Sequence, residues 1–311
     1  MSPTVVEFCA GAGGMALGLE RAGFVPLMLV EEQVDPCATL LLNRPLWRVR
    51  KADIRTLPRT LAQGTDLLAA GIPCPPFSRA GLQLGQEDVR DLFPTLLAFT
   101  EASRPRALLI ENVPGLLEPR FKDYRAWIET FLRGLRYEVT WGVLNAMDFG
   151  VPQRRQRAFL VALEPGTSPL RWTQPQYLEP VTVGEALLPF MAAQGWPGAR
   201  AWAMAAGKPA PTLVGGSCLH GGADLGPTRT REAWRRLGVS ATSLANAPPA
   251  YDDPPSLHPR LTLAMAARLQ GFPNDWFFAG GKTATYRQIG NACPPPLAEA
   301  MGRAVREALL L

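Results

Sequence analysis

One cysteine lies in a rigid stretch, Gly71–Ser78, which reads GIPCPPFS. Cys74 stands among prolines, which fix φ and donate no backbone N–H, directly after the apolar run DLLAAGI. We therefore predict a stiff loop at the end of a buried strand, where ligands and chemistry collect in an open α/β sheet. A buried structural cysteine is the alternative explanation. Cys74 is thus a candidate nucleophile that the other motifs have to support.

A glycine-rich stretch near the N-terminus, EFCAGAGGMALGLERAG, is the second candidate site. We expect it to join the first strand to the first helix, where glycines let the backbone approach a ligand and the helix N-terminus offers N–H groups. Gly11, Gly13 and Ala16 also satisfy the loose dinucleotide pattern G-x-G-x-x-G/A. A nicotinamide oxidoreductase and a tight turn without ligand therefore both remain open at this point.

Two acidic residues follow the next predicted strands. Glu31 lies about twenty residues beyond Gly11, where a carboxylate can accept hydrogen bonds from both ribose hydroxyls. Asp53, in KADIR, follows the presumed third strand, where it can accept from an adenine amino group. The sequence therefore predicts a nucleoside-binding edge of the sheet.

The elements that position these residues are predicted from alternating apolar runs and amphipathic stretches between residues 3 and 163. This alternation predicts an α/β fold with a doubly wound, mostly parallel sheet. After Glu164 the sequence becomes rich in Pro, Gly, Trp and Arg with weak periodicity, which predicts a smaller, irregular domain. The expected strands are 4–8, 25–31, 66–72, 106–112, 137–145 and 157–163, the helices lie near 14–23, 90–103 and 121–134, and the domains are 1–164, 165–257 and a returning segment, 258–311.

Composition limits the class of protein. The 311 residues are 47% hydrophobic and 19% charged, which is typical of a globular protein with a large core. The net charge of +5 permits polyanion binding, and five cysteines without CxxC spacing beside two histidines argue against a disulfide framework or a zinc site. There is no apolar run long enough to span a bilayer and no leader pattern. We expect a cytoplasmic protein with no metal and no membrane association.

Four more motifs complete an ordered set: ENV at 111–113, PQRRQRAFLVA at 152–162, RLQGFP at 268–273 and YRQIGNACPPPLA at 286–298. Together with the glycine loop and PCPPFS, they resemble the C5-cytosine-specific DNA methyltransferases of bacterial restriction-modification systems. The resemblance covers nearly the whole chain except 165–257. It implies a Rossmann-like S-adenosylmethionine-dependent methyltransferase fold in which 165–257 is the target-recognition domain. The dehydrogenase interpretation explains none of the five motifs after the glycine loop.

The resemblance assigns four catalytic residues. A thiolate that adds to cytosine C6 turns C5 into an enamine carbon able to attack a sulfonium methyl, and the family thiolate matches Cys74. Glu111 matches the glutamate that meets N3 and the exocyclic amine, for which it must be protonated. Arg157 binds the base O2 and Arg155 supports the nucleophile loop. Arg155 and Arg157 are expected to alternate along one strand and to point to the same face.

The resemblance also assigns the cofactor contacts. Asn291, in GNA, is the contact expected from the last motif, although a helix-capping role is a fair alternative. The chain departs from the family pattern at Cys9, where phenylalanine is usual, at Pro75, at the pair Ala264-Met265, where Arg-Glu is common, and at Cys293. The full set of expected contacts is Cys9, Ala10, Gly11, Gly13, Gly14, Met15, Glu31, Asp53, Ile54, Leu92 and Asn291.

The target base has to be flipped out of the duplex, so a loop that closes over DNA is expected after the nucleophile. Sequence readout is expected between Lys208 and Gly238, where arginines stand among glycines, although TREAWRRL is also typical of a plain amphipathic helix with Trp234 and Leu237 inward. The predicted DNA contacts are Ser78, Arg79, Arg90, His220, Arg229, Arg231 and Arg235.

These observations predict an S-adenosylmethionine-dependent DNA (cytosine-5)-methyltransferase that acts on double-stranded DNA as a monomer, with a possible cognate restriction endonuclease in the same system. When bound to DNA it would be associated with the nucleoid. Two alternatives stay open: a tRNA cytosine-5 methyltransferase of the same fold, and a methylation-defective DNA-binding regulator.

Overall fold

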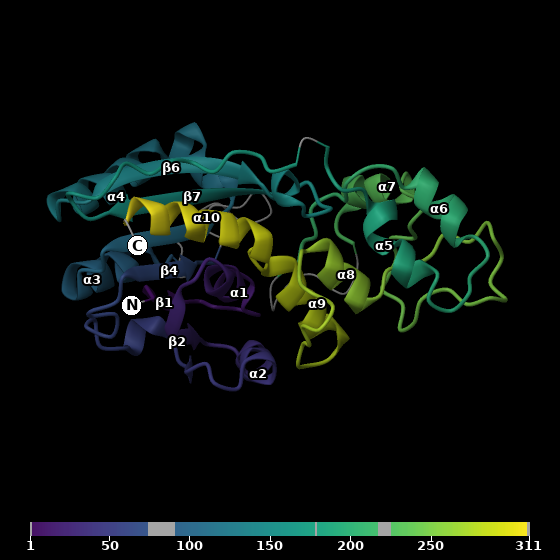
Figure 1. Cartoon of the computed structure of the whole chain (residues 1–311), viewed down its shortest axis with the longest axis horizontal. Coiled ribbons are helices and arrows are strands. Elements are labelled where there is room, and N and C mark those ends of the chain that lie inside the picture. Colours follow the sequence, from purple (N-terminus) through teal and green to yellow (C-terminus); the bar gives the residue numbers. More distant parts are fainter. Residues whose placement is uncertain (1, 74–90, 178, 217–224, 310–311) are drawn as a thin grey trace. The chain divides into compact units, whose positions relative to one another are not determined.

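The computed structural model describes residues 2–73, 91–177, 179–216 and 225–309 (Figure 1). The chain divides into two compact units, each treated by itself below. The first comprises residues 1–144, 156–174 and 297–311, and the second comprises residues 145–155 and 175–296.

The first unit is built on a seven-stranded sheet in the order β3-β2-β1-β4-β5-β7-β6. The pairs from β3 through β5 are parallel, and β7 runs antiparallel to β5. The α/β fold with a mostly parallel sheet is therefore confirmed. The strands are β1 (Thr4–Phe8), β2 (Val25–Glu31), β3 (Val49–Lys51), β4 (Leu67–Gly71), β5 (Ala107–Asn112), β6 (Glu138–Asn145) and β7 (Gln156–Leu163).

Helices cover this sheet, and one of them returns from the end of the chain (Figure 1). The side chain of Arg306, on α10, donates to the carbonyl of Ala22 at 3.0 Å, just after α1. A Cβ on Gly302 would lie 2.7 Å from the Ala22 Cβ, so α10 reaches the end of α1 only because residue 302 is glycine. The helices with residues in this unit are α1 (Gly14–Arg21), α2 (Val34–Asn43), α3 (Phe93–Ser103), α4 (Lys122–Gly134) and α10 (Pro295–Ala308), with short 3-10 turns at Ile54–Thr56, Pro114–Leu117 and Pro119–Phe121.

The core of the first unit makes the ends of β4 and β5 rigid. All six residues of β5 are buried, as expected for a central strand covered on both faces. Phe8 on β1 and Phe99 on α3 meet edge to face with ring centroids 4.7 Å apart, and both are fully buried. Burial of one such ring contributes roughly 1.5–3 kcal/mol. The side chains that follow β4 and β5 are thus carried by a well-packed framework.

The second unit is helical and irregular in its described part. It contains α5 (Val183–Met191), α6 (Ala199–Ala205), α7 (Thr228–Arg235), α8 (Leu263–Leu269) and α9 (Lys282–Asn291), with a 3-10 turn at Ala146–Phe149. Trp234 and Tyr286 are fully buried among its large side chains. A Cβ on Gly184 would overlap the carbonyl oxygen of Ala203, so α5 and α6 pack through backbone contact at this glycine.

Candidate active site

The glycine loop is fastened to the end of β2. Cys9, Gly11 and Gly13 have φ values of 55°, 52° and 83°, a left-handed conformation that glycine adopts freely and cysteine rarely. The amide of Ala10 donates to the carbonyl of Val30 at 3.1 Å, and the amide of Gly11 donates to Glu31 Oε2 at 2.8 Å. Among the described residues, no atom beyond its chain neighbours lies within 4 Å of a Cβ built on Gly11, so none of them covers its backbone there.

The carboxylate of Glu31 is held mainly by backbone amides. Its Oε1 accepts from the amides of Glu32 at 2.9 Å and Gln33 at 2.8 Å, in addition to the bond from Gly11 to Oε2. A carboxylate offers about four acceptor positions, so about one remains for a ligand hydroxyl. The predicted place of Glu31 at the carboxyl end of β2 agrees with the structure.

Asp53 begins the 3-10 turn that follows β3. Its Oδ1 accepts from the amide of Arg55 at 2.9 Å, and its Oδ2 pairs with Arg55 Nη2 at 2.7 Å. Hydrogen bonds from the Arg55 side chain and amide lower the pKa of Asp53, so its carboxylate stays charged well below neutral pH. An adenine amino group would share this carboxylate with Arg55. The neighbouring Ile54 is buried and offers an apolar surface at the same turn.

Glu111 and Arg157 form a buried ion pair at the end of β5. Arg157 Nε lies 2.6 Å from Glu111 Oε1, and the two side chains are 10% and 6% exposed. The antiparallel pairing of β5 with β7, in which Glu111 lies opposite Phe159, brings them together. Two predicted catalytic residues therefore share one place, and the direct contact between them is a feature that the motifs did not predict.

Gly71 links this ion pair to the glycine loop. It lies opposite Glu111 in the β4–β5 pairing, and a Cβ on it would lie 3.9 Å from Glu111 Oε2, 3.7 Å from the carbonyl oxygen of Cys9 and 3.9 Å from Met15 Cε. The predicted cofactor loop and the predicted catalytic glutamate thus converge on the strand end that precedes Cys74. Sequence reasoning gave Gly71 no role, although its place at a strand end before the candidate nucleophile was a usable signal.

Several predicted residues lie outside the described residues: Cys74, Ser78, Arg79, Arg90 and His220. Two other cysteines are described in the same unit. Burial, followed by the charges of Glu31, Glu32, Glu7 and Asp53, raises the pKa of the Cys9 thiol far above its usual range, and burial raises the pKa of Cys37 to about 11. Both remain protonated at neutral pH and are poor nucleophiles.

Glu7 is a buried acid that sequence reasoning missed. It lies on β1 directly before the glycine loop and is 1% exposed. Burial and the nearby charge of Glu31 raise its pKa well above the usual range, so we expect it to be protonated. Its Oε2 has no hydrogen-bond partner among the described residues.

Arg155 and Asn291 belong to the second unit. Arg155 lies directly before β7, and its guanidinium donates to the carbonyls of Leu213, Gly290 and Ala292 at 2.8–3.0 Å. Arg155 and Arg157 are both buried, as the expected alternation requires. The described contacts of Arg155 differ from those of Arg157, which pairs with Glu111. Asn291 ends α9 and donates from Nδ2 to the carbonyl of Gly216 at 3.1 Å.

The remaining predicted cofactor residues surround the glycine loop or begin α3. Ala10, Gly13, Gly14 and Met15 are buried in or directly after the turn, and Leu92 is the residue before α3 and is buried.

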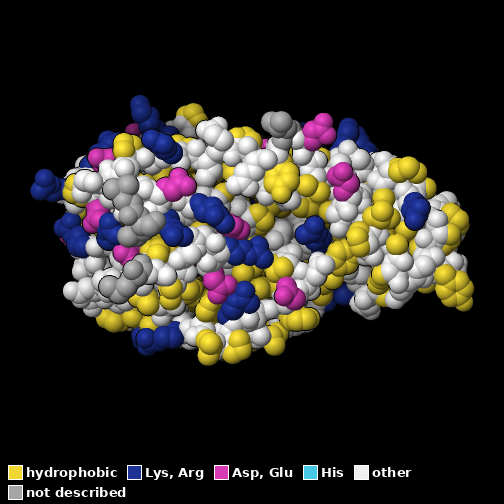
Figure 2. Space-filling model, viewed as in Figure 1, with side chains coloured by type: hydrophobic (Ala, Val, Ile, Leu, Met, Phe, Trp, Pro, Cys, Tyr) yellow, Lys and Arg dark blue, Asp and Glu magenta, His cyan; other side chains and the backbone are white. Residues whose placement is uncertain are grey.

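The predicted DNA-contacting arginines of α7 have different environments. Arg229 and Arg235 are exposed, and Arg235 Nη1 lies 3.5 Å from Glu232. Arg231 is partly buried, because its Nε donates to the carbonyl of Gly226 at 2.7 Å. Trp234 is fully buried, as the amphipathic pattern requires. On the face shown in Figure 2, Lys and Arg side chains lie dispersed among acidic and apolar ones.

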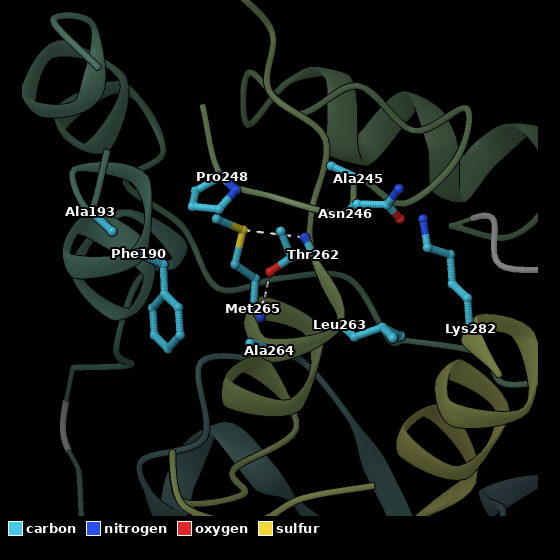
Figure 3. A pocket seen from close by; sticks show the side chains of 10 residues that line it. All are labelled: Phe190, Ala193, Ala245, Asn246, Pro248, Thr262, Leu263, Ala264, Met265 and Lys282. Carbon is cyan, nitrogen blue, oxygen red and sulfur yellow. Dashed lines mark hydrogen bonds between the residues drawn. The ribbon is translucent and has the colours of Figure 1, made fainter. Parts of the chain in front are cut away.

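A cavity of about 300 Å³ lies within the second unit, where α5, α8 and the start of α9 meet (Figure 3). Its wall includes Ala264 and Met265, the positions where the chain departs from the family pattern. The Thr262 hydroxyl accepts from the amide of Met265 at 3.2 Å, and the Met265 sulfur lies 3.3 Å from the amide of Thr262, where a glutamate would close a capping box. None of the residues that line this cavity is a predicted site residue.

Within the described ranges, no three His, Cys, Asp or Glu side chains gather in a way that could hold a metal ion. Of the helices described, none is both long enough and apolar enough to cross a membrane.

The sheet order, with β7 antiparallel to β5, and the glycine turn bound to an acid at the end of β2 agree with the fold of the S-adenosylmethionine-dependent methyltransferases. The sequence model of the C-5 cytosine-specific DNA methylases matches residues 3–187 and 223–307, and the chain belongs to this family. It is accordingly a DNA (cytosine-5)-methyltransferase.

Curated relatives support this family assignment along the whole chain. The Type II methyltransferase M.NaeI of Lentzea aerocolonigenes is 50% identical over 311 residues, which cover 98% of this chain and 75% of the relative. The Type II methyltransferase M.NgoMIV of Neisseria gonorrhoeae is 44% identical, with 99% of both chains covered. The dehydrogenase interpretation is thereby excluded, and tRNA as the substrate is not favoured.

Solved structures share the fold. The Dnmt2 methyltransferase of S. pombe superimposes with a TM-score of 0.65 at 18% identity, covering 99% of this chain and 100% of the other. The Spodoptera frugiperda Dnmt2 structure gives a TM-score of 0.66 at 16% identity, covering 98% and 99%.

Proposed function

We propose that this enzyme methylates C5 of a flipped-out cytosine in a specific double-stranded DNA site through a covalent bond between Cys74 and cytosine C6. The observation that carries the proposal is the buried Glu111–Arg157 pair beside Gly71, three residues before Cys74. The reaction needs an acid, a base-binding arginine and a thiol, and Cys74 follows the end of β4 by three residues in the sequence. The names of the relatives favour a modification enzyme of a restriction-modification system.

The reaction follows from these side chains. The Cys74 thiolate adds to C6 while Glu111 gives a proton to N3, so that C5 becomes a nucleophilic enamine carbon. Bound S-adenosylmethionine supplies the methyl group as an electrophile. After transfer, a base removes the C5 proton, the C6–S bond breaks, Cys74 leaves as a thiolate, and N3 returns its proton to Glu111. The C6–S bond that forms is thus broken again, and the net change replaces the C5 hydrogen with methyl.

Arg157 has two tasks in this scheme. Without a base, its guanidinium neutralises the Glu111 carboxylate at 2.6 Å. When cytosine enters, its O2 accepts a hydrogen bond from Arg157, and Glu111 takes up a proton from water and holds it toward N3. Arg155, for which the family resemblance implies support of the nucleophile loop, also fixes carbonyls of the second unit.

The cofactor binds along the glycine loop and the ends of β2 and β3. Glu31 accepts from a ribose hydroxyl, Asp53 accepts from the adenine amino group, and Ile54 packs on the adenine ring. The Gly11 backbone, which none of the described residues covers, and the acceptor position left on Glu31 support this assignment. The other proposed contacts are Cys9, Ala10, Gly13, Gly14, Met15, Leu92 and Asn291.

DNA recognition is assigned to residues 165–257, between a catalytic segment, 1–164, and the returning segment, 258–311. Phosphate contacts outnumber base contacts in such interfaces, so only some of the arginines read bases. We propose that the enzyme is a monomer in the cytoplasm, associates with the nucleoid when bound to DNA, and has a cognate restriction endonuclease. The proposed DNA contacts are Ser78, Arg79, Arg90, His220, Arg229, Arg231 and Arg235.

A mechanism-based trap tests the proposal. A duplex library with 5-fluorocytosine is incubated with the enzyme and S-adenosylmethionine, because fluorine at C5 cannot leave as a proton and should hold the adduct. We expect an SDS-stable enzyme–DNA complex with the wild type and none with Cys74→Ser, which should still bind S-adenosylhomocysteine. Absence of the adduct in the wild type would refute the covalent mechanism, and labelling of tRNA in place of DNA would refute the substrate.

A further inference from the structure

A segment of the second unit that leads toward residue 217 is clamped at Leu213. The amide of Leu213 donates to Gln153 Oε1 at 2.9 Å, and its carbonyl accepts from Arg155 Nη1 at 2.8 Å. Gln153, Arg155 and Leu213 are all buried. Both polar groups of one peptide residue are therefore satisfied by two side chains of the PQRRQR motif. Residues 213–216 lie within Lys208–Gly238, where sequence readout is expected, so this clamp fixes part of that segment.

The same side chains hold the turn after α9. Arg155 Nη2 donates to the carbonyls of Gly290 at 2.8 Å and Ala292 at 3.0 Å. Gln153 Nε2 donates to Gln270 Oε1 at 2.7 Å, and Gln270 Nε2 donates to the carbonyl of Ala292 at 2.6 Å. Gln153 and Gln270 are fully buried, so a lost bond would leave polar atoms without water. The carbonyls on either side of Asn291 are thus held by this buried network.

Asn291 itself touches the clamped segment. Its Nδ2 donates to the carbonyl of Gly216 at 3.1 Å. A Cβ on Gly215 would lie 2.6 Å from Asn291 Oδ1, and a Cβ on Gly290 would overlap the amide of Gly215. Two glycines therefore allow direct backbone contact between the segment and the turn. A displacement of either one has to be transmitted to the Asn291 amide.

We propose that Gln153, Arg155 and Gln270, here called the buried relay, couple DNA recognition to cofactor binding. They hold residues 213–216 and Asn291 in one arrangement, so that DNA bound by the recognition segment and cofactor bound by Asn291 stabilise the same state. The inference rests on the proposed function, which supplies the role of Asn291 and of the recognition segment. The relay residues are positioning residues, since they act through Leu213 and Asn291.

Reciprocal coupling is the expected consequence. If two ligands favour one arrangement, each raises the affinity for the other by the same factor, commonly about 5- to 150-fold. The substrate duplex should therefore tighten binding of S-adenosylhomocysteine. Because the relay consists of uncharged amides and an arginine bound to carbonyls, this coupling should persist across neutral pH.

The test compares the wild type with Gln153→Met and Gln270→Met, which keep similar volume and remove the amides. Calorimetry measures S-adenosylhomocysteine binding alone and with a short duplex that carries the sequence methylated by the wild type in a randomised library. We expect the wild-type coupling factor to exceed about fivefold and to fall to within about twofold of one in both variants. Affinity for S-adenosylhomocysteine alone should change less than the coupling factor.

Thr212→Val is the matched control. The Thr212 hydroxyl donates to the carbonyl of Arg154 at 2.7 Å, so this variant removes a bond between the same two segments outside the relay. It should keep the wild-type coupling. If a methionine variant does not fold, Gly215→Ala separates the segment from Asn291 with the relay intact, and it should lose coupling as well.

Two results would overturn the proposal. In the first, the folded relay variants keep the wild-type coupling factor. In the second, the duplex does not change the affinity of the wild type for S-adenosylhomocysteine. Failure of the proposed function would look different, because the wild type would then fail to methylate the library or to bind S-adenosylhomocysteine at all.

Discussion

Two carboxylates in the first unit, Glu31 at the end of β2 and Glu111 at the end of β5, are both nearly buried but are held in different ways. Glu31 accepts from the amides of Gly11, Glu32 and Gln33, which belong to the backbone and cannot turn away. Glu111 is paired with the side chain of Arg157, whose Nη1 also donates to the carbonyl of Gln156 at 2.7 Å, so this partner is held by side-chain torsions and not by the backbone alone. The first arrangement suits a permanent binding edge, and the second suits an acid that changes partner during a reaction.

Glu111→Gln tests whether Glu111 acts in the reaction, and it should have the largest effect. Glutamine keeps the shape of the side chain but cannot give N3 a proton, and general acid catalysis contributes typically 10²- to 10⁴-fold. We expect single-turnover methyl transfer to fall by about that factor, while S-adenosylhomocysteine affinity stays within about twofold. Rapid quench with labelled cofactor measures the first quantity and calorimetry the second. An equal loss in both would mean that Glu111 is part of the scaffold, as Glu31 is.

Glu31→Ala tests whether Glu31 binds the cofactor. The change removes a charged acceptor from the cofactor and from three backbone amides, each an interaction worth about 1–3 kcal/mol when a charge is involved. Cofactor affinity should fall by roughly 5- to 150-fold, since 1.4 kcal/mol corresponds to a factor of ten. Calorimetry with S-adenosylhomocysteine measures the change.

Glu32→Ala is the control for Glu31, because its side chain is exposed and only its amide enters the network. It should leave the affinity unchanged. A Glu31→Ala variant with wild-type affinity would remove Glu31 from the cofactor site.

Glu7 differs from both carboxylates, because within the described part of the chain neither an amide nor a side chain donates to its Oε2. Its pKa is raised in the folded state by burial and by Glu31, so folding binds a proton that the unfolded chain releases above about pH 4.3. Its contribution to stability is therefore full below that pH and is lost as pH rises toward the folded pKa, with a slope of up to about 1.4 kcal/mol per pH unit.

Glu7→Gln should remove that pH dependence. The free energy of unfolding of the variant, relative to the wild type, should rise from pH 4 toward neutrality, as measured by urea denaturation at several pH values. A difference that does not change with pH would mean that Glu7 is charged in the folded protein.

The sequence predicted the sheet better than the contacts of the site. Strands 4–8 and 25–31 match β1 and β2 residue for residue, because each is a short apolar run that ends next to the glycine loop or an acidic pair. Helix α2 (Val34–Asn43) was not predicted, since VDPCATLLLN reads as an apolar run with an early proline. TREAWRRL, by contrast, forms a helix with Trp234 buried.

The motifs assigned Glu111 and Arg157 to the same target cytosine, but they did not predict that the two side chains contact each other. The contacts of Arg155 could not be predicted either. Its carbonyl partners at Leu213 and Gly290 lie 58 and 135 residues further along the chain, and the pairing depends on how the second unit packs. Long-range contacts of this kind leave no local pattern in the sequence.

Of the two carboxylates assigned to the cofactor, Glu31 and Asp53, substitution of Asp53 should have the smaller effect on cofactor affinity. Asp53 combines the two kinds of partner that Glu31 and Glu111 have separately, because it accepts from the amide of Arg55 and pairs with the side chain of the same residue. Its side chain is 28% exposed, so solvent screens the pair. Asp53→Ala should weaken S-adenosylhomocysteine binding less than Glu31→Ala does, by roughly 1 kcal/mol. Arg55→Ala removes the guanidinium and leaves the carboxylate to the amide of residue 55 and the adenine amino group, so it should keep or improve affinity.

The pH dependence of Asp53 has the opposite sign to that of Glu7. Because hydrogen bonds from Arg55 lower the pKa of Asp53, the stability that it contributes is present above its unfolded pKa and is lost as pH falls through the folded value. The free energies of unfolding of the wild type and Asp53→Ala, measured in urea, should therefore differ at neutral pH and converge in acid, because the wild type gains stability from the charged Asp53. For Glu7→Gln the difference also grows toward neutral pH, but there the wild type is the protein that loses stability. If Arg55→Ala lowered the affinity for S-adenosylhomocysteine as much as Asp53→Ala does, Arg55 would itself contact the cofactor. The edge formed by β2 and β3 would then depend on an arginine side chain, as Glu111 depends on Arg157.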